Sequence, residues 1–93
     1  MIARSAFPKL ADKAKLRLDK KTNQQVLLYP EKGLVLNRTG AAIVLLCTGE
    51  HSVQQIIDRL QREHEQAPPA VIENEVLTFL ETLVGRGLVR VDP

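Results

Sequence analysis

The feature that most constrains the fold is a change of hydrophobic period close to Asn37. Before this residue, apolar and polar side chains alternate with a period of two, which is typical of β-strands. The alternation predicts three strands, at residues 15–19, 25–29 and 34–36. The last two are joined by a turn over residues 30–33, in which Pro supplies the first central φ angle and Gly closes the turn. Strands joined by such short connections should form an antiparallel meander.

After Asn37, the apolar residues recur at helical spacing. Asn37 is expected to cap a helix that ends at Gly49. A second helix should start at the capping-box pair Ser52 and Gln55, and a third at the two prolines of residues 68–69. Five apolar side chains of the third helix are expected to face inward, and three more widen its apolar surface. The inward set is Ile72, Val76, Phe79, Leu80 and Leu83, and the additional set is Val71, Leu77 and Val84.

Three strands followed by three helices predict one α+β domain over residues 1–93. We expect a winged helix-turn-helix-like arrangement, with a three-stranded antiparallel meander followed by a three-helix bundle. Residues 1–14 show no clear period and are interpreted as a loose N-terminal arm. Residues 88–91 are predicted to form a short terminal strand. A chain of 93 residues builds one modest core and leaves little room for a deep active site.

The sequence carries few residues that catalysis or metal binding would use. Cys47 is the single cysteine, and it is expected to be a buried structural residue. His51 and His64 have no metal-ligand spacing with Cys47 or with a carboxylate pair. The glycines of residues 85–87 follow a helix, so they end it and do not cradle a phosphate. We therefore expect no catalytic residue, no metal and no cofactor, and predict that the chain is not an enzyme.

The lone cysteine also predicts an intracellular protein without disulfides. Residues 1–10 lack the apolar run of a signal peptide, and no stretch approaches the roughly 20 apolar residues that span a bilayer. The expected location is therefore the cytoplasm, with no membrane partner.

Charge is unevenly distributed between the two halves of the chain. Residues 1–38 carry nine Lys and Arg against three Asp and Glu, a balance of +6, whereas residues 39–93 carry four against eight, a balance of −4. A winged helix-turn-helix DNA-binding protein is the alternative function, but the expected recognition helix exposes Glu73, Glu75 and Glu81. The basic side chains instead concentrate in the arm and the first strand. They are Lys9, Lys13, Lys15, Arg17, Lys20 and Lys21.

The third predicted strand is an edge of the meander that no charge or proline protects. Its side chains are apolar on both faces, because Leu34 and Leu36 point one way and Val35 the other. Such an edge, beside a helix with surplus apolar surface, suits a peptide that binds by strand addition. Two alternatives stay open: residues 88–91 could pair with this edge, or a second copy could cover it in a homodimer.

The chain resembles the pyrroloquinoline quinone biosynthesis protein D (PqqD) family from residue 8 to residue 89. The residues that carry this resemblance are Leu16-Arg17-Leu18-Asp19, Val26-Leu27-Leu28-Tyr29-Pro30-Glu31, Leu34-Val35-Leu36-Asn37, Cys47-Thr48-Gly49-Glu50, Ser52-Val53, Ile56-Ile57-Asp58, Leu60 and Leu83-Val84-Gly85-Arg86-Gly87-Leu88-Val89. The resemblance implies a recognition element for a ribosomally made, modified peptide. Such a protein binds the precursor peptide of pyrroloquinoline quinone and presents it to a radical S-adenosylmethionine enzyme, which joins a Glu and a Tyr of the peptide.

In the family, the peptide adds as a strand beside the third strand and lies against the last helix. Carried onto this sequence, the resemblance implies a peptide-binding site made of Leu34, Val35, Leu36, Asn37, Arg38, Val76, Phe79, Leu80 and Leu83, of which about half of the helix residues should be core. Family members often carry acidic residues after the third strand, where residues 38–40 of this chain read Arg-Thr-Gly. Local charge recognition is therefore expected to differ.

Overall fold

The computed structural model describes residues 2–30 and 32–91. The elements, in chain order, are β1 (Lys9–Leu10), β2 (Lys15–Asp19), β3 (Gln24–Tyr29), β4 (Lys32–Leu36), α1 (Arg38–Leu46), α2 (Val53–Glu63), α3 (Pro69–Gly85) and β5 (Val89–Arg90). The α+β class, the three-stranded antiparallel sheet and the three helices are confirmed. The winged helix-turn-helix likeness stays a prediction.

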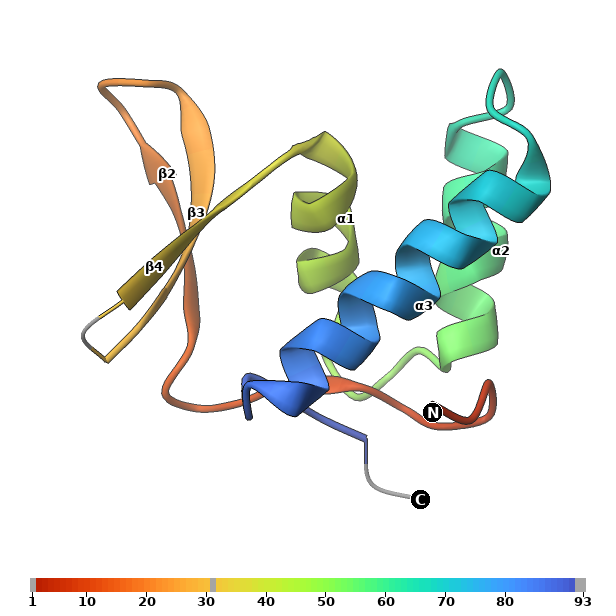
Figure 1. Ribbon diagram of the computed structural model, residues 1–93, viewed down its shortest axis with the longest axis horizontal. Coiled ribbons are helices and arrows are strands. Elements are labelled where there is room, and N and C mark those ends of the chain that lie inside the picture. Colours follow the sequence, from red (N-terminus) through yellow and green to blue (C-terminus); the bar gives the residue numbers. More distant parts are fainter. Residues whose placement is uncertain (1, 31, 92–93) are drawn as a thin grey trace.

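The sheet, α1 and the α2–α3 pair follow one another across the molecule (Figure 1). Strands β2, β3 and β4 are paired antiparallel in this order, and α1 contacts all three. Leu16, Leu27 and Leu34 stand opposite one another in the sheet register. Leu27 is 0% exposed and joins the hydrophobic core, so this row of leucines faces α1.

The connection between β3 and β4 is shorter than the sequence pattern indicated. Tyr29 pairs with Lys32, and Gly33 lies inside β4 opposite Leu28 instead of closing the turn. A Cβ atom at Gly33 would lie 3.3 Å from Cδ2 of Leu28 and 3.4 Å from Cγ1 of Val26. The missing side chain lets those two neighbours pack over the strand, so pairing continues where a turn was expected. Residue 31, also part of the predicted turn, lies outside the described residues.

Local capping chemistry sets the helix starts that the sequence predicted. The Oδ1 atom of Asn37 accepts a hydrogen bond of 2.7 Å from the backbone N–H of Gly40. At α2, the Ser52 hydroxyl accepts from the N–H of Gln55 at 3.1 Å, and the Gln55 side chain accepts from the N–H of Ser52 at 2.7 Å. Both bonds of the capping box are therefore present. Helix α3 starts at Pro69, directly after Pro68.

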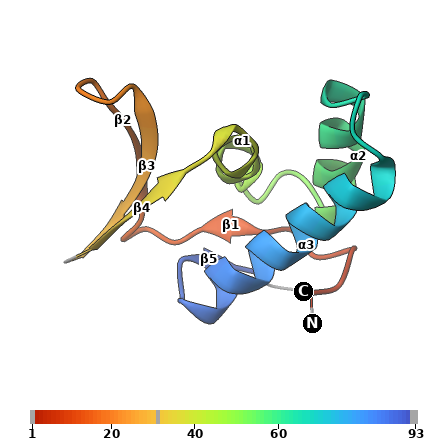
Figure 2. The same ribbon diagram turned by 45° about the horizontal axis from the view of Figure 1, so that its top comes forward.

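The prediction of a loose arm is wrong for residues 2–14. Ile2, Ala6 and Ala14 belong to the hydrophobic core. Strand β1 pairs antiparallel with β5 beside the end of α3 (Figure 2). The segment is also held by its backbone: the N–H of Leu10 donates to the carbonyl of Cys47 at 2.9 Å, and that of Ala11 to the carbonyl of Leu88 at 2.8 Å. Residues 2–14 therefore join the α1–α2 connection to the terminal strand.

The core itself is aliphatic and lies between the helices and the inner face of the sheet. The fully buried members, each 0% exposed, are Leu27, Val53, Ile56, Ile57, Leu60, Val76, Leu80, Leu83 and Leu88. Among the described residues no charged or polar side chain is buried. Stability therefore comes from apolar burial and backbone hydrogen bonding, and not from buried ion pairs.

Cys47 gives the core a measurable pH dependence. It is 3% exposed, and burial raises the pKa of its thiol from 9.0 to about 12. The unfolded chain loses this proton above about pH 9 while the folded chain keeps it, so stability falls as the pH rises from about 9 towards 12. Between pH 8 and pH 10 we expect the free energy of unfolding to decrease by about 1.4 kcal/mol through this group.

The measurement is urea unfolding of the wild type and of Cys47→Ala at both pH values. The variant will be less stable throughout because it leaves a small cavity, but its stability should change with pH by about 1.4 kcal/mol less. Identical pH dependence in the two proteins would mean that the thiol titrates normally in the fold.

Candidate functional site

The outer edge of β4 has no strand beside it in the part of the chain that the structure describes. The sheet order is β2-β3-β4, and β5 pairs with β1, so residues 88–91 do not cover this edge. Leu36 is buried, Leu34 is half-buried and Val35 is 57% exposed, which confirms that Val35 points away from its two neighbours. The edge therefore offers free backbone groups, flanked by apolar side chains.

Next to the end of β4, a hollow of about 420 Å³ opens between the start of α1 and the middle of α3. Its position depends on Gly40, in the first turn of α1. A Cβ atom there would lie 3.4 Å from Cζ of Phe79, 3.1 Å from Oδ1 of Asn37 and 3.7 Å from Cβ of Leu36. The small residue therefore lets strand, cap and α3 meet at one point. The lining residues are Asn37, Thr39, Gly40, Ile43, Asn74, Glu75, Thr78, Phe79 and Thr82.

The structure separates the predicted site residues on α3 into core and surface. Phe79 is half-buried and lines the hollow. Val76, Leu80 and Leu83 are 0% exposed and belong to the core. Three of the four helix candidates thus support the site from behind and do not face it.

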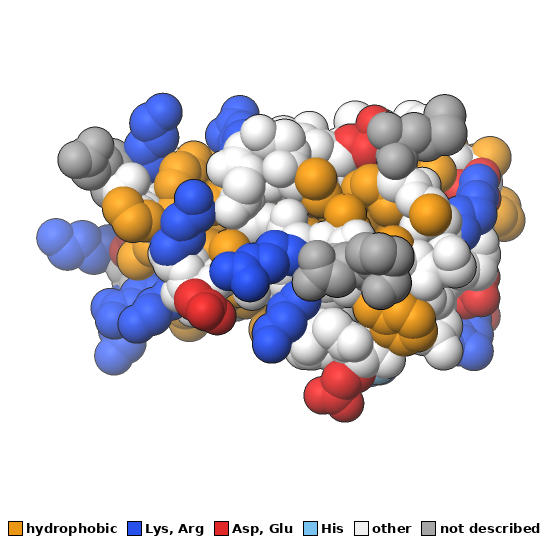
Figure 3. Space-filling model, turned by 90° about the horizontal axis from the view of Figure 1, so that it is seen from below, with side chains coloured by type: hydrophobic (Ala, Val, Ile, Leu, Met, Phe, Trp, Pro, Cys, Tyr) orange, Lys and Arg blue, Asp and Glu red, His pale blue; other side chains and the backbone are white. Residues whose placement is uncertain are grey.

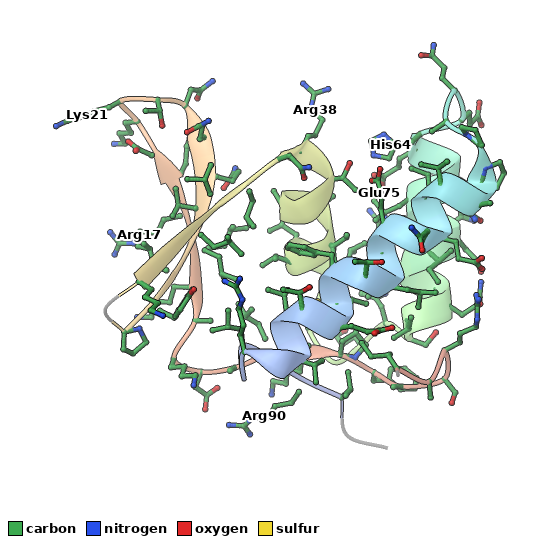
Figure 4. The ribbon with its side chains drawn as sticks, viewed as in Figure 1. Arg17, Lys21, Arg38, His64, Glu75 and Arg90 are labelled. Carbon is green, nitrogen blue, oxygen red and sulfur yellow. The ribbon has the colours of Figure 1, made fainter. Side chains whose placement is uncertain are left out.

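The predicted residues around β4 also divide. Leu34, Val35 and Leu36 form the edge, and Asn37 reaches the hollow. Arg38 is exposed at the first residue of α1 and is not among the lining residues; Figure 4 shows its side chain extending away from the body of the protein. The site is therefore built from the β4 edge, the Asn37 cap and one face of α3.

Sequence reasoning missed the polar side of the hollow. Asn74, Thr78 and Thr82 recur every four residues along α3, and Glu75 lies next to this row. Such spacing places side chains on one helix face, so a search for a polar stripe adjoining Phe79 would have found them. The Thr82 hydroxyl donates to the backbone carbonyl of Thr78 at 3.0 Å.

This arrangement suits recognition of a chain and not a reaction. The hollow offers an aromatic ring, threonine hydroxyls, an amide and one carboxylate, which can receive a side chain next to an extended backbone. No group of His, Cys, Asp and Glu within residues 2–30 and 32–91 could hold a metal ion. None of the helices described there combines the length and apolar character needed to cross a membrane.

Comparison with known proteins agrees with this geometry. The family model for coenzyme PQQ synthesis protein D (PqqD) matches residues 24–89. The chain is 39% identical over 77 residues to a PqqA binding protein of Methylococcus capsulatus, and the matched segment covers 81% of this chain and 80% of that protein. It is 35% identical over 79 residues to the bifunctional coenzyme PQQ synthesis protein C/D of Methylorubrum extorquens, covering 85% of this chain and 21% of the longer protein.

A solved structure resembles the whole fold. It is the solution NMR structure of the PqqD truncation of Methylobacterium extorquens PqqCD, which represents a functional and stand-alone recognition element for ribosomally synthesised and post-translationally modified peptides. The TM-score is 0.80 at 31% sequence identity, and the match covers 97% of this chain and 95% of the other. The family model and the relatives together show that this chain belongs to the PqqD family of coenzyme PQQ synthesis proteins.

Proposed function

We propose that this protein is a peptide chaperone of pyrroloquinoline quinone synthesis, which binds the precursor peptide and presents it to a radical S-adenosylmethionine enzyme. The observation that carries the proposal is the unpaired β4 edge running directly into the hollow beside Phe79. Relatives named PqqA binding protein support the same ligand. The Methylobacterium extorquens neighbour, a recognition element for this class of peptide, supports the same mode of use.

In this proposal the peptide extends the sheet as a fourth strand beside β4. Its backbone hydrogen-bonds to the outward-facing N–H and C=O groups of β4, which gives grip without regard to sequence. Successive side chains of an extended peptide point to opposite faces. Those on the helix side reach Phe79, Thr78 and Thr82 in the hollow, which supplies the choice between peptides.

The reaction itself belongs to the partner enzyme, which cross-links a Glu and a Tyr of the peptide. This protein contributes no reacting group and needs no cofactor. By holding a flexible substrate and contacting the enzyme, it raises the effective concentration of the peptide at the active site. The proposal places this assembly in the cytoplasm.

The same edge is where a homodimer would form, if two β4 strands paired. Such a dimer and the peptide would compete for the same backbone groups. Sedimentation equilibrium with and without peptide separates the two states. A dimer that persists at saturating peptide would place the peptide elsewhere.

The proposed function is tested by titrating ¹⁵N-labelled protein with synthetic precursor peptide. We expect the largest amide shifts at residues 34–40 and around Thr78, Phe79 and Thr82. Two matched peptides are N-methylated at alternate residues, one at the odd and the other at the even positions. Only one of these two sets of N–H groups can point towards β4, so we expect only the peptide that lacks this set to bind at least tenfold more weakly. Shifts confined to α2 would reject the site, and an absence of shifts would reject the function.

A further inference from the structure

The three-stranded sheet has a second face, which shares only Val35 with the proposed peptide site. Helix α1 covers the inner face, whereas the outer face bears every second residue of each strand. We call this the outer sheet face. By the strand register it consists of Lys15, Arg17, Asp19, Gln24, Val26, Leu28, Gly33 and Val35. Figure 4 shows the Arg17 side chain leaving the sheet on the side away from the helices.

The sheet register arranges these residues into a basic border and an apolar centre. Arg17 stands opposite Val26, which stands opposite Val35. Lys15 stands opposite Leu28, which stands opposite Gly33. The positive charges thus follow β2 as far as Arg17, with Asp19 opposite Gln24 at its end, and the aliphatic side chains follow β3 and β4. Figure 3 shows Lys and Arg side chains gathered over the sheet end of the molecule, with hydrophobic side chains between them.

The apolar centre is open to solvent. Val35 is 57% exposed and Leu28 is 38% exposed. A shallow hollow of about 230 Å³ begins at Leu28 and is bordered by the basic residues Lys13, Lys15 and Arg17, together with Tyr29 and Pro30. An exposed apolar patch with a charged rim is typical of a protein interaction site.

Within residues 2–30 and 32–91, the basic side chains of this face form no salt bridge. The salt bridges of the described residues join Arg4 to Glu73 and Arg59 to Glu63, so they do not involve Lys13, Lys15 or Arg17. The acids nearest in sequence are Asp12, directly before Lys13, and Asp19, at the end of β2, whose Oδ1 atom accepts from the backbone N–H of Lys21 at 3.0 Å. The positive field of this face is therefore available to an incoming negative surface.

We propose that the outer sheet face docks an acidic protein surface with an apolar centre, at the same time as the precursor peptide occupies the β4 edge. The identity of that partner rests on the proposed function, which makes it the radical S-adenosylmethionine enzyme. The two sites are separate, because the hollow beside Phe79 lies on the helix side of the sheet and Arg17 points away from the helices.

Charge and shape favour a protein over other anionic partners. The exposed centre is aliphatic, and the one aromatic residue that borders its hollow, Tyr29, is half-buried, which gives nucleic-acid bases little surface for stacking. The apolar area is small and carries no Trp for a membrane interface. A second copy of this chain would have to offer its acidic helices, and such a head-to-tail contact does not close into a dimer. An acidic surface of a different protein meets both the border and the centre.

The test compares two double charge reversals in the full-length protein. Lys15→Glu with Arg17→Glu alters the outer sheet face, whereas Lys20→Glu with Lys21→Glu makes the same charge change in the exposed β2–β3 turn. Leu28→Gln alters the apolar centre without changing charge. Affinity for the purified enzyme and affinity for the synthetic precursor peptide are each measured by calorimetry in 50 mM and 300 mM salt. Far-UV circular dichroism checks that each variant is folded.

We expect the Lys15 and Arg17 reversal to weaken enzyme binding about tenfold at low salt and less at high salt, because salt screens exposed charges. Leu28→Gln should weaken it at both salt concentrations. Peptide affinity should stay within about twofold in every variant, and the Lys20 and Lys21 reversal should change enzyme affinity little.

The inference is overturned by equal enzyme affinity for the wild type and the outer-face variants, by an equal loss in the turn control, or by a parallel loss of peptide binding. Wild-type protein that binds peptide but not enzyme would also overturn it. Failure of the wild type to bind peptide rejects the proposed function instead, and is seen in the separate peptide titration. Duplex DNA and phosphatidylserine vesicles are tested in the same way. If either binds the wild type and only the outer-face reversal removes this binding, the face belongs to that partner and not to a protein.

Discussion

Thr78→Trp is expected to weaken binding of the precursor peptide about 30-fold, or roughly 2 kcal/mol, while the protein stays folded. Thr78 is exposed on α3 and lines the hollow at the end of β4. A Trp side chain there fills the space that the proposed peptide side chain needs. The free energy of unfolding should change by no more than about 0.5 kcal/mol, because the position is on the surface and no partner of its side chain is lost.

The matched control is Ala70→Trp, which places the same large side chain at an exposed position of α3 outside the hollow. It should bind peptide like the wild type. Both variants are measured by calorimetry, with thermal unfolding as the check on stability. If Thr78→Trp and Ala70→Trp bind equally well, the peptide does not enter the hollow, and the β4 edge alone would have to account for binding.

The elements of this fold could be predicted because their signals are local. A strand of five residues alternates within itself, and a capping box such as Ser52 with Gln55 spans one helical turn. The β1–β5 pairing has no such signal. Each strand has two residues, and the partners Lys9 and Arg90 lie 81 positions apart. No pattern in residues 1–14 reveals that they pair with the end of the chain, so the lack of a hydrophobic period wrongly predicts a lack of structure.

The candidate site was predictable only in part, for a different reason. The β4 edge followed from what residues 34–36 lack, namely charge and proline, whereas Lys32, the first residue of β4, lay outside the predicted strand. On α3, apolar residues occupy more of the circumference than one packed face needs, and periodicity cannot tell which of them face solvent. Val76 and Phe79 are both apolar and three positions apart, yet Val76 is 0% exposed and Phe79 borders the hollow. That difference depends on how closely Gly40 lets α1 approach Phe79 on α3, which is a property of the tertiary structure.

Deleting residues 2–11 is expected to lower the free energy of unfolding by roughly 4 kcal/mol. Ile2, Ala6 and Pro8 lose their buried positions, and the deletion uncovers Leu88 and Val89, which are 0% and 3% exposed in the intact protein. Complete burial of one large aliphatic side chain is worth about 1.5–3 kcal/mol. The deleted residues no longer have to be ordered on folding, and the conformational entropy saved in this way offsets part of the sum. For a domain whose whole stability is about 5–15 kcal/mol, the loss is severe.

Thermal unfolding and urea denaturation measure this effect, and a decrease in Tm of more than about 15 °C is the expected result. Phe7→Ala is the control within the same segment, because Phe7 is 47% exposed and its loss should cost no more than about 0.5 kcal/mol. If the truncated protein is as stable as the wild type, the segment is a loose arm, as the sequence pattern predicts. Since the segment lies apart from the β4 edge, a truncated protein that stays folded in the cold should still bind the peptide. Residues 2–11 would then serve the fold and not recognition.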